Sequence, residues 1–126
     1  MRTTFIAASA ALSLLLPQDA ALAQAAPDQG SSELVRHCKV AQRDAKTITS
    51  AKDLFDSAQC LRYIEGFVAG ASTQNARPFC IPSATRIIDE VNAYVTWTDK
   101  HQDTLSQPKH VTLLSALREA YPCRSN

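Results

Sequence analysis

The clearest structural pattern in the chain lies in CLRYIEGFVAGASTQNARPFC, Cys60–Cys80. At helical spacing its apolar side chains share one face, formed by Cys60, Ile64, Phe67, Val68 and Ala71. Gly66, Ala69 and Gly70 form a second face with almost no side-chain bulk, which a neighbouring backbone could approach closely. Because a helix with two such faces is expected to be covered twice, we place it at the centre of a helical bundle.

The rest of the chain predicts three more helices and no strand, which makes the fold class all-α with four helices. Apolar spacing predicts these helices over about residues 31–43, 83–100 and 106–121. The caps expected for them are Ser31 or Ser32, Ser83 or Thr85, and Ser106. The polar segment Asp44–Lys52 predicts a loop, with Asp53–Phe55 as a candidate extra turn. The central helix is then expected to be capped by Asp56 or Ser57 and to end near Asn75.

The N-terminus, Met1–Ala23, has the pattern of a cleaved export signal. Arg2 supplies the positive charge, and the apolar run Phe5–Leu16 is shorter than the ~20 residues that span a bilayer. Ala21–Ala23 forms the cleavage motif; an uncleaved anchor is the alternative. We therefore predict a signal peptide over 1–23, a disordered leader over 24–30 and one helical domain over 31–126, located in the periplasm and without a later membrane span.

The charge composition excludes one class of partner. The chain has 13 basic and 12 acidic residues, so a nucleic-acid-binding protein, which would need a basic stripe, is not indicated. The near balance also gives no electrostatic attraction toward an anionic membrane. The predicted domain has about 100 residues, and a core of that size gains much from covalent cross-links.

Four cysteines in a short exported chain predict two disulfides, because their spacing lacks the C-x-x-C pairs of a metal site. A Cys60–Cys80 bond is disfavoured, since the ends of the central helix would lie about 22 Å apart while a disulfide needs Cα atoms within ~7 Å. Its companion, Cys38–Cys123, is then disfavoured as well. In an up-down bundle the helix ends that meet favour Cys38–Cys60 and Cys80–Cys123.

No catalytic motif is present, so we expect neither an enzyme nor a bound cofactor or metal. His37, His101 and His110 are isolated in sequence, which is more typical of surface or capping histidines than of a site. Trp97 has two interpretations: a flank residue half covered by its neighbours, or an aromatic anchor that contacts a partner.

The segment framed by Cys60 and Cys80 also carries a family resemblance. Its motif C-x-x-Y-x-x-G-x-x-x-G is followed by F-C-x-P and later by A-L-x-x-x-[FY]-P-C. This order resembles the Rap1a/Tai family of exported immunity proteins of bacterial type VI secretion, and Cys38 fits the family's first cysteine. The matching positions are Cys60, Tyr63, Gly66, Gly70, Phe79, Cys80, Pro82, Ala116, Leu117, Pro122 and Cys123. The chain departs from the family at His101-Gln102, where His-Pro is common.

The resemblance implies a small helical protein of the periplasm that often forms a homodimer. Studied members bind and block a peptidoglycan amidase effector by inserting a protruding loop into its cleft, although no motif identifies that loop here. We therefore interpret the chain as an immunity protein whose partner is such an effector. The alternative is a periplasmic helical chaperone of the acid-activated type, which would expose apolar surface at low pH and suppress the aggregation of clients.

Overall fold

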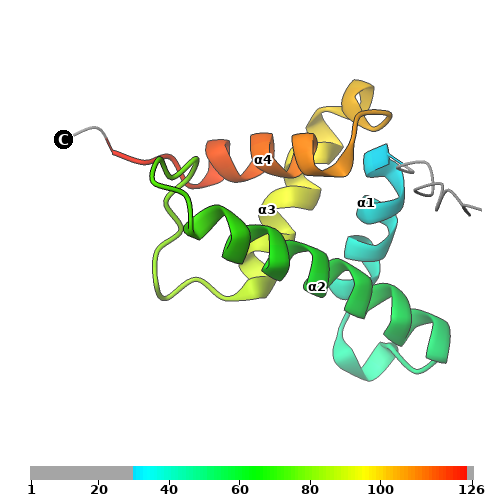
Figure 1. The fold of residues 1–126 in the computed structure, drawn as a ribbon. Helices are drawn as coiled ribbons and strands as arrows, with labels where there is room; N and C mark the ends of the chain where they lie inside the picture. Colours follow the sequence, from blue (N-terminus) through cyan, green and yellow to red (C-terminus); the bar gives the residue numbers. More distant parts are fainter. Residues whose placement is uncertain (1–29, 125–126) are drawn as a thin grey trace, which may run out of the picture.

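The computed structural model describes residues 30–124, which form four α-helices, two short 3₁₀ helices and, over that range, no strand (Figure 1). The elements in chain order are α1 Gly30–Ala41, η1 Ala45–Thr47, α2 Ala51–Ser72, α3 Ile87–Lys100, η2 Gln102–Thr104 and α4 Lys109–Ala120. The all-α prediction is confirmed. The predicted signal peptide and the leader up to residue 29 lie outside the described residues.

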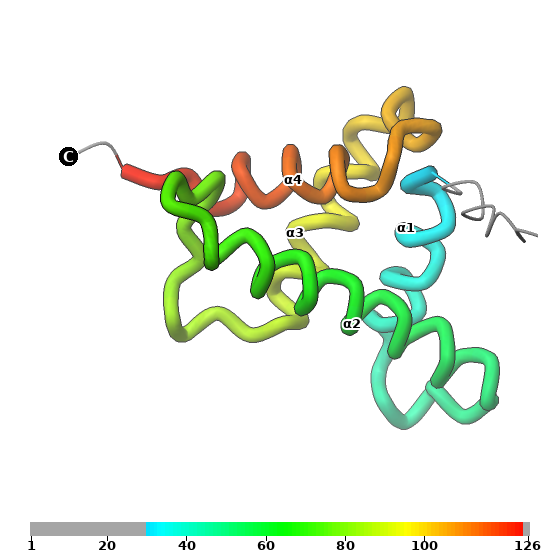
Figure 2. Tube along the Cα trace, viewed as in Figure 1, coloured from blue at the N-terminus to red at the C-terminus, as the bar shows by residue number. Residues whose placement is uncertain are grey.

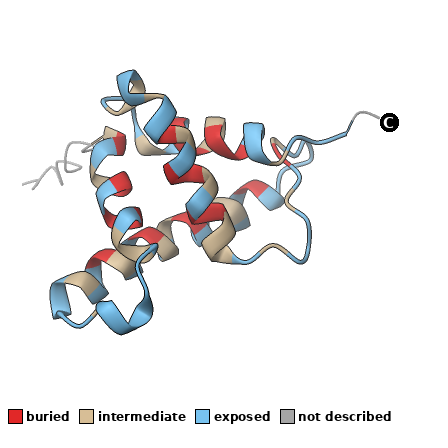
Figure 3. Ribbon diagram, turned by 180° about the vertical axis from the view of Figure 1, so that it is seen from behind, coloured by how far each residue is buried: buried red, intermediate tan, exposed pale blue. Residues whose placement is uncertain are grey.

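α1 and α3 run across the direction that α2 and α4 share (Figure 1). α2 and α4 run in the same direction and end at the same pole, as the tube view shows (Figure 2). α1 packs mainly against α2, and α3 contacts each of the other three helices. The buried residues of α1, α2, α3 and α4 face this common interior (Figure 3). No described helix is long and apolar enough to cross a membrane.

Both predicted disulfides are present, and they differ in environment. Cys38 bonds to Cys60 between α1 and α2, and both residues are fully buried. Cys80 bonds to Cys123 at the pole where α2 and α4 end, and both residues are exposed. The backbone N–H of Cys80 also donates to the carbonyl of Tyr121 at 2.8 Å, so a hydrogen bond accompanies the outer cross-link.

A chain of hydroxyl groups lies inside the core, which the sequence pattern did not predict. Ser31 Oγ lies 2.6 Å from Thr112 Oγ1, and the Tyr94 hydroxyl lies 3.2 Å from the same Thr112 oxygen. Ser31 also donates to the carbonyl of Gln107 at 2.8 Å. The expectation that Ser31 or Ser32 caps the first helix is wrong, because α1 starts at Gly30 and both serines lie inside it; the buried Ser31 side chain joins α1 to the segment before α4. Mutual hydrogen bonding offsets the desolvation of these hydroxyls.

α2 begins at Ala51, well before the predicted start. Ser50 is its N-cap, and its side-chain oxygen accepts the backbone N–H of Asp53 at 3.0 Å. The predicted caps Asp56 and Ser57 are thus inside the helix. The segment from Asp44 was expected to be an unstructured loop, but a cap that satisfies a free N–H and the good helix formers after it extend α2 into it.

The expected caps of the later helices are also wrong: Ser83, Thr85 and Ser106 precede the observed helix starts. α3 begins after Arg86, whose backbone N–H donates to the Asp89 carboxylate at 3.0 Å. α4 begins after Pro108, whose fixed φ suits a helix entry without a side-chain cap.

The glycines behave differently from the prediction. A Cβ added at Gly66 or Gly70 would meet nothing within 4 Å, and both residues are exposed, as is Ala69. The expected close approach of another backbone is therefore not found within residues 30–124; this face borders a groove of about 470 Å³ beside α4. Gly30, expected in the leader, instead starts α1 with φ of 57°, and a Cβ there would lie 3.1 Å from the carbonyl oxygen of Leu105.

Candidate partner-binding corner

The turn from α1 into α2, residues 42–56, forms one end of the molecule, and we call it the α1–α2 corner. It lies far from the C-terminal pole in the ribbon and tube views (Figures 1 and 2). Most of its residues are exposed (Figure 3). Its 3₁₀ turn is held by Asp44, whose side chain accepts the backbone N–H of Lys46 at 2.9 Å.

Two neighbouring apolar side chains on the corner face solvent. Leu54 is 58% exposed and Phe55 is 61% exposed, in the first turns of α2. The other large hydrophobic residue that is exposed in the described part of the chain, Val111 on α4, is less accessible at 38%. Isolated apolar residues on a surface are common, so this adjacent pair marks the corner as a candidate contact surface only.

The backbone beneath this pair is fixed by several contacts. Arg43 donates to the Asp53 carboxylate at 3.1 Å and to the Thr47 carbonyl at 2.9 Å, which links the end of α1 to the start of α2. The buried Cys38–Cys60 disulfide holds the same two helices together further inside. A rigid contact surface loses little conformational entropy on binding.

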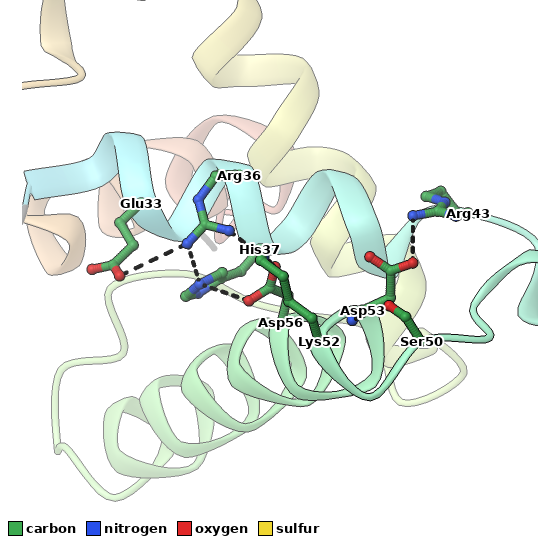
Figure 4. A network of polar contacts seen from close by, with 8 residues as sticks. All are labelled: Glu33, Arg36, His37, Arg43, Ser50, Lys52, Asp53 and Asp56. Atoms are coloured by element: carbon green, nitrogen blue, oxygen red, sulfur yellow. Dashed lines mark hydrogen bonds and ion pairs between the residues drawn. The ribbon is translucent and has the colours of Figure 1, made fainter.

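Asp56 is the centre of a polar cluster that joins α1 to α2 (Figure 4). Its side chain is almost completely buried; Oδ2 accepts hydrogen bonds from Lys52 and, at 2.9 Å, from Arg36 Nη1. Oδ1 lies 3.4 Å from His37 Nε2. The hydrogen bond from Lys52 is the main cause that lowers the pKa of Asp56, so its carboxylate stays ionised.

His37 completes the cluster from α1, where it is 8% exposed. Arg36 Nη2 lies 2.9 Å from His37 Nε2, and a guanidinium can only donate, so Nε2 accepts and the ring is neutral in this arrangement. Burial, followed by the charge of Arg36, lowers the pKa of His37. The neutral ring is thus the form that this structure stabilises.

The histidines are not brought together. His37 lies in the Asp56 cluster, His101 stacks on Trp97, and His110 lines the groove beside α2. Between residues 30 and 124 there is no group of three or more His, Cys, Asp or Glu side chains that could hold a metal ion. The cysteines are consumed by the two disulfides, so the described residues hold no thiol nucleophile.

Trp97 lies on α3, apart from the α1–α2 corner, and is half-buried. Its Nε1 donates to Glu119 on α4 at 2.9 Å, and its ring stacks on His101 at 4.1 Å between centroids. These contacts agree with the first interpretation, in which Trp97 is a flank residue half covered by its neighbours. A role for Trp97 in partner contact stays a prediction.

The other predicted motif residues have identifiable positions. Tyr63 is half-buried on α2, with the ammonium of Lys109 at 4.9 Å from its ring centroid. The carbonyl of Pro82 accepts a hydrogen bond at 3.0 Å in the turn before α3, and Pro122 follows the end of α4. Gly66 and Gly70 border the open groove described above.

Comparison with protein families gives one result that agrees with this architecture. The Rap1a immunity proteins match residues 30–123, which include all four helices and both disulfides. The chain belongs to the Rap1a immunity protein family. No significant match to a curated protein or to a solved structure was found. Membership of the Rap1a family implies an immunity protein that binds an effector protein, and proteins of this family are generally not enzymes.

Sequence reasoning missed the corner, although a signal was available. Extending the helical period of α2 back from Ile64 and Cys60 places Asp56 on the same buried face. It places Leu54 and Phe55 away from that face, so both apolar side chains were predictable as exposed. The spacing of Lys52 and Asp56, four residues apart, is also that of a helical ion pair.

Proposed function

We propose that this Rap1a protein resides in the periplasm and neutralises a peptidoglycan amidase effector of type VI secretion by binding it through the α1–α2 corner. The family match supports the immunity role, and the N-terminal export pattern supports the location. The amidase is the effector class that the resemblance implies. Inhibition of this kind needs only a surface that fills or covers the cleft of the target.

The observation that carries the choice of surface is the exposure of Leu54 and Phe55 on a fixed helix. Transfer of a large apolar side chain from water into an interface contributes about 1.5–3 kcal/mol. A few such residues at the centre of an interface commonly dominate its affinity. Within this chain the pair has little packing role, since more than half of each side chain is in water.

The test uses the mature protein and a secreted amidase encoded beside it, with the affinity measured by calorimetry. The double variant Leu54→Ser/Phe55→Ser is expected to weaken binding by a factor of at least about 30, which corresponds to about 2 kcal/mol. Val111→Ser is the matched control, because it removes an exposed apolar side chain from α4 instead. Equal affinity of the double variant and the wild type would exclude the corner as the contact.

Two further outcomes are distinguishable. If the wild type binds no co-encoded effector but suppresses the aggregation of unfolded proteins at low pH, the chaperone interpretation is correct instead. Homodimer formation, which the resemblance also implies, is measured separately by light scattering of the free protein. Effector binding by a monomer is compatible with the proposal.

A further inference from the structure

His37 Nε2 lies between a donor and an acceptor. Arg36 Nη2 is 2.9 Å away and Asp56 Oδ1 is 3.4 Å away. In the neutral ring Nε2 accepts from Arg36; in the protonated ring Nε2 carries a proton and needs an acceptor. The acceptor is therefore already beside the ring (Figure 4).

We propose that His37 is a proton-operated switch between α1 and α2. When Nε2 takes up a proton from solvent, its hydrogen bond with Arg36 breaks and a new one to Asp56 Oδ1 forms, while Arg36 Nη2 turns away from the ring and Nη1 keeps its hydrogen bond to Asp56 Oδ2. No other bond changes, and the cluster gains one positive charge.

The Arg36 side chain has room to move away from the His37 ring. Its side chain is 52% exposed, so it can move without disturbing the core. Its Nη2 already lies 3.9 Å from the Glu33 carboxylate, one turn earlier on α1. Asp56 can receive the new donor because Lys52 and Arg36 both bind its other oxygen, Oδ2.

The charges around the His37 ring keep both its neutral and its protonated form accessible. Burial, Arg36 and Lys52 favour the neutral ring, whereas Asp56 and Glu33 favour the protonated one. The groove beside His37 is also lined by two more cations, Arg62 from α2 and Lys109 from α4. Because these opposing effects partly cancel, the His37 ring can take up a proton in the folded protein, at a pH below the ordinary titration range of histidine.

Protonation of His37 adds a positive charge to the cluster beside the exposed Leu54 and Phe55, because Lys52 and Asp56 of that cluster flank them on α2. An effect of pH on effector binding follows from this and rests on the proposed function. The switch itself does not depend on the proposed function, and it is tested on the free protein. Failure of the switch and failure of effector binding are therefore separate results.

The experiment is an NMR titration of the ¹⁵N-labelled mature protein from pH 8 to pH 4. We expect His37 Nε2 to be unprotonated at pH 8 and to titrate below the ordinary histidine range. The guanidinium signals of Arg36 should shift with the same midpoint as the His37 signals. A proton on Nε2 at pH 8, or Arg36 signals that do not follow His37, would overturn the switch.

Two variants test the charges on either side of the ring, while the coupled shift of the Arg36 signals distinguishes the switch from a merely buried histidine. Arg36→Gln removes the donor and a nearby positive charge, so the midpoint of His37 should rise. Asp56→Asn removes the charge that favours protonation, so the midpoint should fall. Shifts in the same direction contradict the proposal. Should Asp56→Asn fail to fold by circular dichroism, the wild-type titration and the Arg36→Gln variant still decide it, because Arg36 is largely on the surface.

Discussion

Cys38 and Cys60 are bonded in the fully buried contact between α1 and α2, with their Cα atoms 5.0 Å apart. Thiols in solution cannot reach this bond while the protein is folded, whereas Cys80 and Cys123 are exposed. We therefore expect a mild reductant to cleave Cys80–Cys123 first under native conditions. Alkylation followed by peptide mass spectrometry measures the order; equal rates for the two bonds would contradict it.

Replacing both Cys80 and Cys123 by Ser should leave a folded but less stable protein. The bond closes a segment with a sequence separation of 43 residues, and the loss expected from chain entropy is about 2–5 kcal/mol. Urea unfolding monitored by circular dichroism measures this. The matched variant without Cys38 and Cys60 should be the more damaged, because it also leaves space in the core.

The glycines of α2 and α1 should respond oppositely to alanine. Gly66→Ala and Gly70→Ala should each stabilise the protein by about 0.5–1 kcal/mol, because a methyl group meets no neighbour and favours the helix. Gly30→Ala should destabilise it, since φ is 57° and the Leu105 carbonyl oxygen is only 3.1 Å from the new Cβ. Thermal unfolding compares them; destabilisation by Gly66→Ala would mean that this face is covered.

The buried Glu90 on α3 should make the stability of the protein fall as the pH rises. It is 7% exposed, and burial, with a contribution from Asp89, raises the pKa of its carboxyl group. The folded state therefore favours the protonated form, so the stability that Glu90 contributes is present at low pH and is lost as the pH rises through its folded pKa. Glu90→Gln should raise the Tm by a few degrees at pH 7 and make little difference near pH 4. A constant difference across this range would contradict the assignment.

Tyr94→Phe tests the buried hydroxyl chain. The change keeps the ring and removes one hydrogen bond to Thr112, whose oxygen still lies 2.6 Å from Ser31. We expect a loss of about 0.5–1.5 kcal/mol in the free energy of unfolding. Thr112→Val should cost more, because it leaves both Tyr94 and Ser31 without that partner. Chemical denaturation of the two variants measures the difference.

The fold class and the disulfides were predictable because they depend on simple geometry. The apolar spacing around Ile64 requires a helix, and the length of that helix separates Cys60 from Cys80. Helix starts were less predictable, since several Ser, Thr and Asp residues compete as caps and tertiary contacts select among them. The N-cap of α2 is Ser50 rather than Asp56, because Asp56 faces α1 and binds Arg36 there.

The glycine prediction failed for a related reason. The spacing of Gly66 and Gly70 shows that a face is small, but it contains no information on what covers that face. The corner depends similarly on contacts between α1 and α2, such as Arg36–Asp56, whereas the Lys52–Asp56 pair lies within α2 and has a recognisable spacing. The spacing of a sequence therefore predicted the disulfides, but it did not predict which side chains from α1 and α2 would meet around Asp56.

The different burial of the two disulfides also sets an order of oxidation during maturation. In the proposed periplasmic location we expect Cys38 and Cys60 to be oxidised before α3 and the rest of the core close over them, because both are fully buried in the folded domain. Cys80 and Cys123 stay accessible in the finished domain and can be joined last. An export route that delivered the chain already folded would therefore leave the inner pair as thiols.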